Sequence, residues 1–279
     1  MIIDGRKIAE EVLGELKKEI ESKKLKLRLA AVLVGNDPEF EKFVQIKGKK
    51  AEEIGIEYPI YQFPKDIETE ELAKRVKEIS AISDGALIEL PLPEHIDQQT
   101  VLNQIPVDKD VDVLSSASQR RFYADKERGF DADSRVLPPA VEALKIVLDE
   151  FGVELKDKKV AVFGQGILVG APVSYWLEKQ GMEVFRIDSE TKNPGQYSKI
   201  SDLIVTGVGK PDLVTGDMVK NGVVVVDFGY GKKDNKMVGD IDFESVSSKA
   251  LLITPVPGGM GPVLIVAVLK NLIKLYNIS

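Results

Sequence analysis

The sequence predicts an α/β protein with central, mostly parallel sheets. Apolar runs of strand length alternate with amphipathic helical segments along all 279 residues. In the second half, the runs over 202–208 and 223–229 are continuously apolar, as the strands of a parallel sheet covered on both faces require. The length suggests two domains, at about 150 residues per domain.

The first half alternates helices and strands, and prolines end its last strand. Pro91 and Pro93 cannot donate ladder hydrogen bonds, so the chain must leave the sheet there. The polar stretch 115–135 is expected to be a connector or a surface flap. The elements expected before it are a helix over 6–23, an apolar strand within 27–35, a helix over 39–54, a strand near 58–63, a helix over 69–80 and a strand over 85–90.

The second half begins with a helix over 138–152, with prolines in its first turn, where they are favoured. A strand over 158–164 and a glycine-rich turn then lead into a helix over 169–181. Further strands and a closing helix are expected over 183–188, 202–208, 223–229, 251–256 and 261–276.

Composition excludes several kinds of function. The net charge of -7 argues against a nucleic-acid-binding surface, and the absence of cysteine rules out disulfides and thiolate chemistry. His95 is the only histidine and is interpreted as a surface or capping residue, so we expect no metal site. The sequence has neither a signal peptide nor an apolar run of about 18 residues, which predicts a cytoplasmic protein without a membrane span.

A glycine-rich turn joins a strand to a helix in VAVFGQGILVG, which contains Gly164, Gly166 and Gly170. Glycines let the backbone approach a pyrophosphate, and the helix N-terminus offers N–H groups and a positive dipole. Asp188 ends the next strand, where a carboxylate can accept a hydrogen bond from a ribose 2′-hydroxyl. We therefore expect a dinucleotide site; the alternative is a strand–turn–helix unit without a ligand.

The same residues bear on the choice of dinucleotide. Asp188 would repel the 2′-phosphate of NADP, so residue chemistry favours NAD. Arg186 and Lys192 lie close in sequence and offer positive charge to such a phosphate. At this point the choice between NAD and NADP stays open.

Lys47 interrupts the apolar face of the helix expected over 39–54. Phe40, Phe43 and Val44 define that face, and Lys47 occupies its next turn, where a lysine either snorkels to solvent or faces a cleft. Glu89 interrupts an otherwise apolar strand and is the candidate partner, because a buried carboxylate is costly unless it is paired. Such a pair serves either acid–base chemistry or structure, and spacing alone does not decide between them.

Several segments together resemble the methylenetetrahydrofolate dehydrogenase/cyclohydrolase family across nearly the whole chain. The most specific is ITPVPGGMGPVLIVAVL near the C-terminus. The others are IIDGRKIAEEV, VGNDPEFEKFVQIKGKKAEEIGI, GALIELPLPEHI, KDVDV, VGKPDLVTGDMVKNGVVVVDFG and MVGDIDF. The resemblance implies a folate-binding α/β domain over 1–137, joined by a C-terminal helix over 262–279, a Rossmann-like NAD(P) domain over 138–261, and an active-site cleft between them.

The resemblance also implies roles for single residues. Lys47 matches the catalytic lysine, Glu89 stands at the position of a site glutamine, and Asp112 matches the aspartate that holds the pterin. Substrate contacts are implied for Phe43, Lys47, Glu89, Leu90, Asp112, Pro257, Gly258, Gly259, Gly261 and Pro262. Besides Asp188, cofactor contacts are implied for Gly164, Gln165, Gly166, Ser189 and Tyr230.

The chain departs from the family pattern at these sites. Phe43 stands where the family has tyrosine, so the ring remains without its hydroxyl, and Val113 replaces the glycine after Asp112. Gln165 and Gly166 replace an Arg–Ser pair that favours NADP in many members. This last change strengthens the preference for NAD, whereas NADP is the family default.

The implied chemistry has two steps: oxidation of 5,10-methylenetetrahydrofolate to the methenyl form, and hydrolysis of that product to 10-formyltetrahydrofolate. A neutral lysine can act as base in the second step, but a carboxylate neighbour favours charged lysine. Glu89 therefore either suppresses this route or replaces Lys47 as base, and we expect hydrolysis to be weakened or rerouted.

Two other interpretations stay open. The chain could bind folate and a dinucleotide without turnover, or it could be a two-domain dehydrogenase for another substrate. The expected partners are tetrahydrofolate one-carbon derivatives, and the resemblance implies a homodimer.

Overall fold

The computed structural model describes residues 1–124, 136–154 and 156–278. These residues form two compact units, each of which is an α/β structure with a parallel sheet. The first unit consists of residues 11–139 and 265–279, and the second unit of residues 1–10 and 140–264. The predicted fold class is confirmed.

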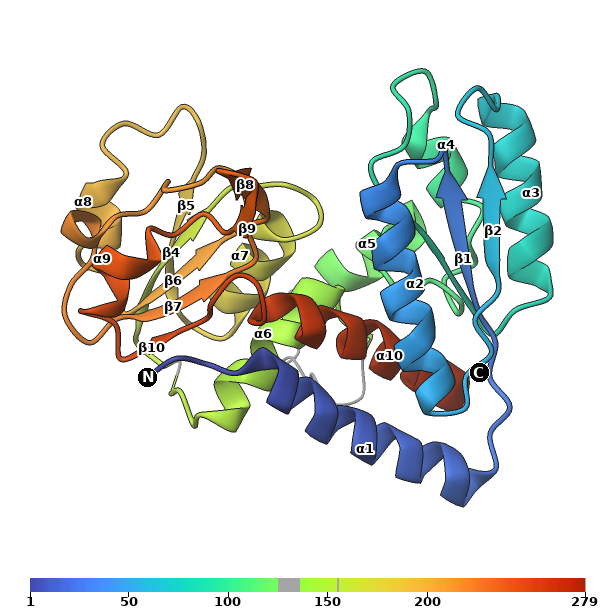
Figure 1. Cartoon of the computed structure of the whole chain (residues 1–279), viewed down its shortest axis with the longest axis horizontal. Coiled ribbons are helices and arrows are strands. Elements are labelled where there is room, and N and C mark those ends of the chain that lie inside the picture. The colour runs from blue at the N-terminus through green and yellow to red at the C-terminus, as the bar shows by residue number, and fades with distance from the viewer. Residues whose placement is uncertain (125–135, 155, 279) are drawn as a thin grey trace. The chain divides into compact units, whose positions relative to one another are not determined.

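A parallel sheet in the order β2–β1–β3 lies at the centre of the first unit (Figure 1). Its strands are β1 (Leu29–Val34), β2 (Ile60–Phe63) and β3 (Gly85–Ile88). In the register of the sheet, Ala31 pairs with both Ile60 and Leu87. The strands expected in this half are present, and β3 ends before the prolines as predicted.

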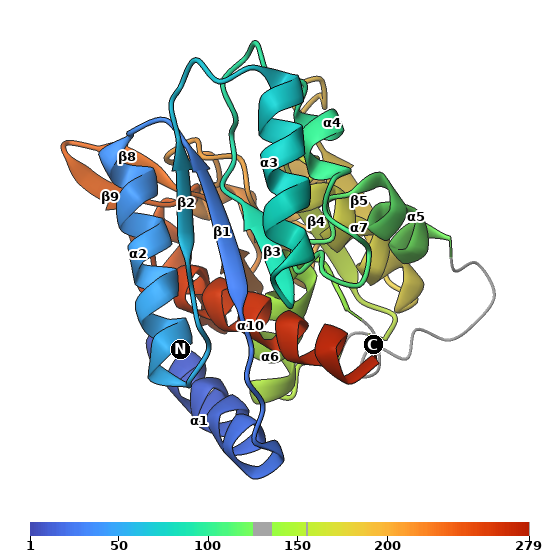
Figure 2. The ribbon, with the colours of Figure 1, turned by 90° about the vertical axis from the view of Figure 1, so that its right-hand side faces the viewer.

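Helices cover both faces of this sheet, with α2 (Pro38–Glu53) and α3 (Thr69–Ala81) on opposite sides of the strands (Figure 2). α2 begins where Asp37 accepts a 2.8 Å hydrogen bond from the backbone N–H of Glu39, a favoured helix start. Leu72 of α3 packs in a core cluster with Val32 of β1. The remaining helices that contribute to this unit are α1 (Gly5–Lys23), α4 (Gln98–Leu102), α5 (Ser116–Tyr123) and α10 (Met260–Ile278).

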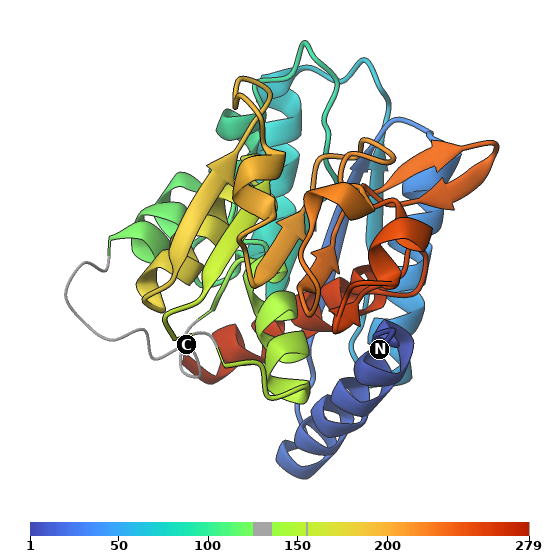
Figure 3. The same ribbon diagram turned by 90° about the vertical axis from the view of Figure 1, so that its left-hand side faces the viewer.

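The second unit contains a parallel sheet in the order β10–β7–β6–β4–β5, drawn as the yellow to orange arrows in Figure 3. Its strands are β4 (Lys159–Phe163), β5 (Glu183–Ile187), β6 (Leu203–Thr206), β7 (Val224–Asp227) and β10 (Leu252–Ile253). Val162 of β4 pairs with Arg186 on one side and Val205 on the other. β4 therefore lies where the strand order reverses.

Short elements complete the second unit. Its helices are α6 (Pro139–Glu150), α7 (Gly170–Lys179), α8 (Gly195–Ser198), α9 (Phe243–Ser247) and a 3-10 turn over Gly216–Met218. An antiparallel hairpin of β8 (Gly231–Lys233) and β9 (Lys236–Val238) was not expected from the sequence. At the edge of the sheet, Ile2 forms a parallel bridge with Ile253, also not expected.

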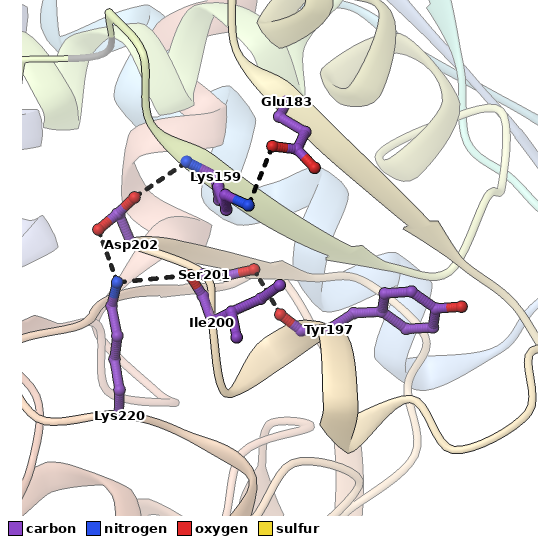
Figure 4. Close-up of polar contacts among 7 residues, drawn as sticks. All are labelled: Lys159, Glu183, Tyr197, Ile200, Ser201, Asp202 and Lys220. Atoms are coloured by element: carbon purple, nitrogen blue, oxygen red, sulfur yellow. Dashed lines mark hydrogen bonds and ion pairs between the residues drawn. The ribbon is translucent and has the colours of Figure 1, made fainter.

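A polar network joins the amino-terminal ends of neighbouring strands in this sheet (Figure 4). The carboxylate of Asp202 accepts a hydrogen bond from the backbone N–H of Lys159 at 2.9 Å and from Lys220 Nζ at 2.7 Å. Lys159 Nζ in turn pairs with Glu183 at 3.2 Å. These contacts join the starts of neighbouring strands, at the opposite ends from the glycine-rich turn.

One expectation needs correction. The stretch 115–135 is predicted to be a connector or flap, but its first part folds as α5, where the Ser115 hydroxyl accepts a hydrogen bond from the Ser118 backbone N–H. Residues 125–135 lie outside the described part.

α10 is long and apolar enough, by length and composition alone, to cross a membrane. Half of it is buried inside the protein, including Val266 and Leu269, as in the core helix of a folded domain.

Candidate functional site

Lys47 and Glu89 form a hydrogen-bonded ion pair between α2 and the end of β3. The side chains are only 23% and 11% exposed, respectively. Lys47 therefore does not snorkel into solvent, and this alternative is excluded. The pair is a partly buried charged group within a single unit of the fold.

Asp112 belongs to the same electrostatic cluster. It lies in the turn after Asp110, whose backbone forms a bridge with Ala86 of β3. Burial raises the pKa of Asp112 to about 7; Lys47 opposes this shift, whereas Glu89 and Asp110 add to it. The cluster thus contains a carboxyl group that exchanges its proton near neutral pH.

Asn271 of α10 supports the backbone immediately before Asp112, and sequence reasoning missed it. Its fully buried amide donates to the carbonyl oxygens of Val111 at 2.8 Å and of Leu137 at 2.7 Å. Val113, on the other side, has a φ of +58°, which is strained for a β-branched residue. The available signal was an amide side chain among the apolar residues in the middle of this helix.

Phe43 and Leu90 flank the Lys47–Glu89 pair along the chain. Phe43 lies one helical turn before Lys47, on the same face of α2, and is half-buried. Leu90 is partly buried and packs against the apolar core to which Val32 and Leu72 belong. Their contacts with substrate stay predictions.

The glycine-rich turn follows β4 as predicted. Gly164 has a φ of +85°, and a Cβ at Gly170 would lie 1.7 Å from the Gly164 carbonyl oxygen, so this turn tolerates no side chain there. Around Gly166, by contrast, no atom of the described residues lies within 4 Å of where a Cβ would stand. The backbone of Gly166 is therefore open to a ligand.

A second loop packs against this turn, and sequence reasoning missed its glycine. A Cβ at Gly207, after β6, would lie 2.7 Å from Cγ1 of Val169. Both loops leave the carboxyl ends of strands at the point where the strand order reverses, the usual place for ligands in such sheets. Exposed apolar side chains gather on these loops and on the one after β7, namely Ile167, Leu168, Val208 and Tyr230.

The turn fits the pyrophosphate of a dinucleotide. α7 begins after Val169, and no side chain of the described residues caps it, so the positive end of the helix dipole stays available to a phosphate. Within its first turn, the backbone N–H of Ala171 donates to the carbonyl oxygen of Gly166 at 3.1 Å. Gln165 is the exception among the expected contacts. Its amide donates to the carbonyl oxygens of Val162 at 3.1 Å and Gly164 at 2.9 Å, so its side chain supports the turn from inside.

Asp188 and Ser189 follow β5 and are exposed. Hydrogen bonds from Thr191 and from the Glu190 backbone N–H hold the pKa of Asp188 below its usual value, so this carboxylate is ionised at neutral pH. Arg186 is held in a bidentate ion pair with Glu178 at 2.8 and 2.9 Å. Of the two cations considered for a 2′-phosphate, Arg186 is thus already engaged.

The loop over 257–262 is built on the N-terminal segment of the chain. Gly258 has a φ of +101°, and its carbonyl oxygen accepts a 3.0 Å hydrogen bond from Gly5 N–H. A Cβ at Gly259 would lie 2.4 Å from the Pro255 carbonyl oxygen. Pro257 and Gly261 are exposed, and Pro262 lies in the first turn of α10.

Family models match both parts of the chain. The catalytic domain of tetrahydrofolate dehydrogenase/cyclohydrolase matches residues 3–112, and the NAD(P)-binding domain of the same family matches residues 138–279. A curated relative, the bifunctional protein FolD of Aquifex aeolicus (strain VF5), is 37% identical over 283 residues, which cover 99% of this chain and 95% of the relative.

Solved structures agree. The bifunctional enzyme FolD, methylenetetrahydrofolate dehydrogenase/cyclohydrolase, from Campylobacter jejuni has a TM-score of 0.93 and 32% identity, covering 100% of this chain and 99% of that chain. A Trypanosoma brucei N5,N10-methylenetetrahydrofolate dehydrogenase-cyclohydrolase, complexed with NADP and an inhibitor, has a TM-score of 0.91 and 28% identity, covering 99% of this chain and 97% of that chain. This chain therefore belongs to the tetrahydrofolate dehydrogenase/cyclohydrolase family.

Proposed function

We propose that this chain oxidises 5,10-methylenetetrahydrofolate to 5,10-methenyltetrahydrofolate with NAD(P) and hydrolyses the product to 10-formyltetrahydrofolate. The observation that carries the proposal is the cluster of Lys47, Glu89 and Asp112 in a member of this family. The glycine-rich turn after β4 supplies the second requirement, a dinucleotide site. A bound nicotinamide contributes the hydride acceptor, and the protein contributes alignment.

On the folate side, we assign Asp112 to the pterin. Its partly desolvated carboxyl group gains most from a ligand that donates N–H groups, which the pterin ring does. Lys47 is assigned to the reacting one-carbon unit, and the Phe43 ring, half-buried on the same helix face, to stacking. Leu90 and the residues Pro257, Gly258, Gly259, Gly261 and Pro262 are assigned to substrate contact and closure by family membership.

Hydrolysis is the step that this chain weakens or reroutes. Water must lose a proton as it attacks the cationic methenyl carbon, so a general base is required. Lys47 Nζ is engaged by the Glu89 carboxylate, so it is not free to take the proton of the attacking water. The proton then has to pass to Glu89, whose carboxylate also places negative charge in the site.

We propose NAD as the preferred dinucleotide. Ionised Asp188 favours a free ribose 2′-hydroxyl and repels a 2′-phosphate, and the ion pair with Glu178 keeps Arg186 from compensating. The backbone of Gly164, Gln165 and Gly166 is assigned to the pyrophosphate. Ser189 and Tyr230, both exposed beside the carboxyl ends of strands, are assigned to the adenosine ribose and to the nicotinamide side.

The proposal extends to organisation and setting. We assign folate binding to residues 1–137 with 262–279, and dinucleotide binding to residues 138–261, in a cytoplasmic homodimer. Light scattering on the purified protein tests the dimer: a mass of twice 30.7 kDa is expected, and a monomeric mass would contradict it.

The test of the proposed activity compares Asp112→Ala with Asp108→Ala. Asp108 is an exposed carboxylate a few residues earlier in the same segment. Cofactor reduction that depends on 5,10-methylenetetrahydrofolate should fall about tenfold or more in the first variant, since one charged hydrogen bond is lost, and stay unchanged in the second. Equal activity of the two variants would contradict the pterin assignment, and no reduction by the parent protein would contradict the activity itself.

A further inference from the structure

Tyr58 places an unsatisfied hydroxyl group in the interior of the first unit. The residue is only 6% exposed, and its hydroxyl oxygen has no hydrogen-bond partner among the described residues. A buried polar group without a partner destabilises the folded state. An unpaired hydroxyl of this kind suggests that it gains a hydrogen-bond partner when the protein acts on its substrate.

The helix that carries Lys47 is shaped to admit this ring. Gly48 is buried in the middle of α2, and a Cβ there would lie 2.9 Å from Cδ1 and 3.4 Å from Cε1 of Tyr58. Glycine within a helix is itself unfavourable compared with alanine. A helical glycine and an unpaired tyrosine hydroxyl, both unfavourable for stability, therefore occur together beside Lys47. The glycine lets the Tyr58 ring lie close to α2.

The Tyr58 hydroxyl lies within electrostatic reach of the charged cluster. Burial raises its pKa, and the negative charges of Glu89 and Asp112 raise it further, so the hydroxyl remains a hydrogen-bond donor throughout the working pH range. Lys47 Nζ donates a hydrogen bond to Oε1 of Glu89. The charged groups that act on one another here are Lys47 from α2, Glu89 from the end of β3, and Asp110 and Asp112 from the following turn.

We propose that Tyr58 is a positioning residue for the hydrolysis step, whose hydroxyl donates a hydrogen bond to the Glu89 carboxylate when Lys47 turns toward bound folate. A partly buried carboxylate that loses its cation needs another partner, and Tyr58 is the neighbouring donor without one. The bond holds Glu89 in place and ionised while water attacks. This inference rests on the proposed function and adds a residue to it.

The experiment measures Tyr58→Phe against Tyr61→Phe. Tyr61 lies three residues further on, and its hydroxyl accepts a 3.2 Å hydrogen bond from Arg28, so it is a matched change away from the cluster. Hydrolysis of 5,10-methenyltetrahydrofolate should slow about tenfold in Tyr58→Phe, because a hydrogen bond to a charged group is lost. The acid limb of the pH–rate profile of Tyr58→Phe should move to higher pH. Its dehydrogenase kcat at saturating folate should stay at the parent value, as should both rates of Tyr61→Phe.

A double-mutant cycle with Glu89→Gln identifies the partner. If Tyr58 acts through Glu89, the tenfold effect should nearly vanish in the Glu89→Gln background. Tetrahydrofolate binding, measured by calorimetry in the same four proteins, should show the same coupling without turnover. A higher melting temperature of Tyr58→Phe with unchanged rate, pH profile and binding would reduce Tyr58 to a packed ring and overturn the inference. Folate-dependent cofactor reduction by the parent protein tests the proposed function separately.

Discussion

The contact between Lys47 and Glu89 decides which proton transfers this site can perform. Both side chains are largely shielded from solvent, and they contact each other directly. A lysine held by a carboxylate orients and stabilises negative charge, but it is a poor base. The same lysine beside an uncharged amide would be free to accept a proton.

Changing Glu89→Gln should therefore raise the ratio of hydrolysis to dehydrogenation, by about tenfold if Lys47 regains the role of base. The two initial rates are measured as methenyl decay and as cofactor reduction. Glu57→Gln is the matched control, since Glu57 forms an exposed ion pair with Arg28 at 2.9 Å. An unchanged ratio in Glu89→Gln would show that Glu89 does not govern hydrolysis.

Asp112 makes the stability of the protein depend on pH. Its pKa in the folded state, about 7, lies above the ordinary value of 3.8, so folding favours the protonated form. The stability from this group is fully present below pH of about 4 and is lost as pH rises through about 7. The neighbouring unit adds the same tendency through Asp227, whose pKa burial raises to about 6.

In Asp112→Asn, the loss of stability that accompanies deprotonation of this carboxyl group should disappear. Between pH 5 and pH 8, the free energy of unfolding of the variant should fall by about 2 kcal/mol less than that of the parent protein. Urea denaturation at the two pH values measures the difference, with Asp108→Asn as the exposed control. Parallel pH dependence of Asp112→Asn and the parent protein would rule out a raised pKa at Asp112.

At the scale of elements, α10 links the core of the first unit to the turn that carries Asp112. Asn271 forms this link through two buried hydrogen bonds to backbone carbonyl oxygens. Asn271→Ala should lower the free energy of unfolding by about 2–3 kcal/mol, because both carbonyl groups lose their donor. It should also raise the folate KM more than it lowers kcat.

The control for this variant lies on the same helix. Asn277 is exposed near the end of α10 and donates to Glu19 at 3.1 Å, so Asn277→Ala should change stability by less than about 0.5 kcal/mol. Chemical denaturation compares the two. Similar losses in both variants would show that the amide of Asn271 does not hold the turn.

The long elements could be predicted because their periodicity is strong. β6 and β7 lie in continuous apolar runs and are fully buried, and α1 and α3 match their expected ranges closely. Short polar elements escaped prediction. α5 begins in a charged stretch through a serine cap, and the β8–β9 hairpin has an exposed, lysine-rich sequence without alternation.

In the first unit, the residues themselves pointed to the site where one residue conflicts with its own element. Lys47 on an apolar helix face and Glu89 in an apolar strand stand out in this way, and the structure pairs them. Tyr58 and Gly207 do not stand out. Their roles depend on packing across the fold, against Gly48 and Val169, which sequence spacing does not reveal.

At the scale of the whole molecule, the two requirements of the reaction are divided between the units. The cluster of Lys47, Glu89 and Asp112 belongs to the first unit, and the glycine-rich turn and Asp188 belong to the second. Folate binding and dinucleotide binding should therefore respond to separate substitutions, whereas turnover requires both. Both family domains are matched within this one chain.

The most direct test is a spectroscopic assay of the parent protein with 5,10-methylenetetrahydrofolate, run separately with NAD and NADP, which follows reduced cofactor and methenyl product together. We predict faster reduction of NAD than of NADP, with methenyl product accumulating as the reduced cofactor forms. Absence of folate-dependent reduction with either dinucleotide would contradict the dehydrogenase assignment. Reduced cofactor without methenyl accumulation would contradict the claim that Glu89 weakens hydrolysis.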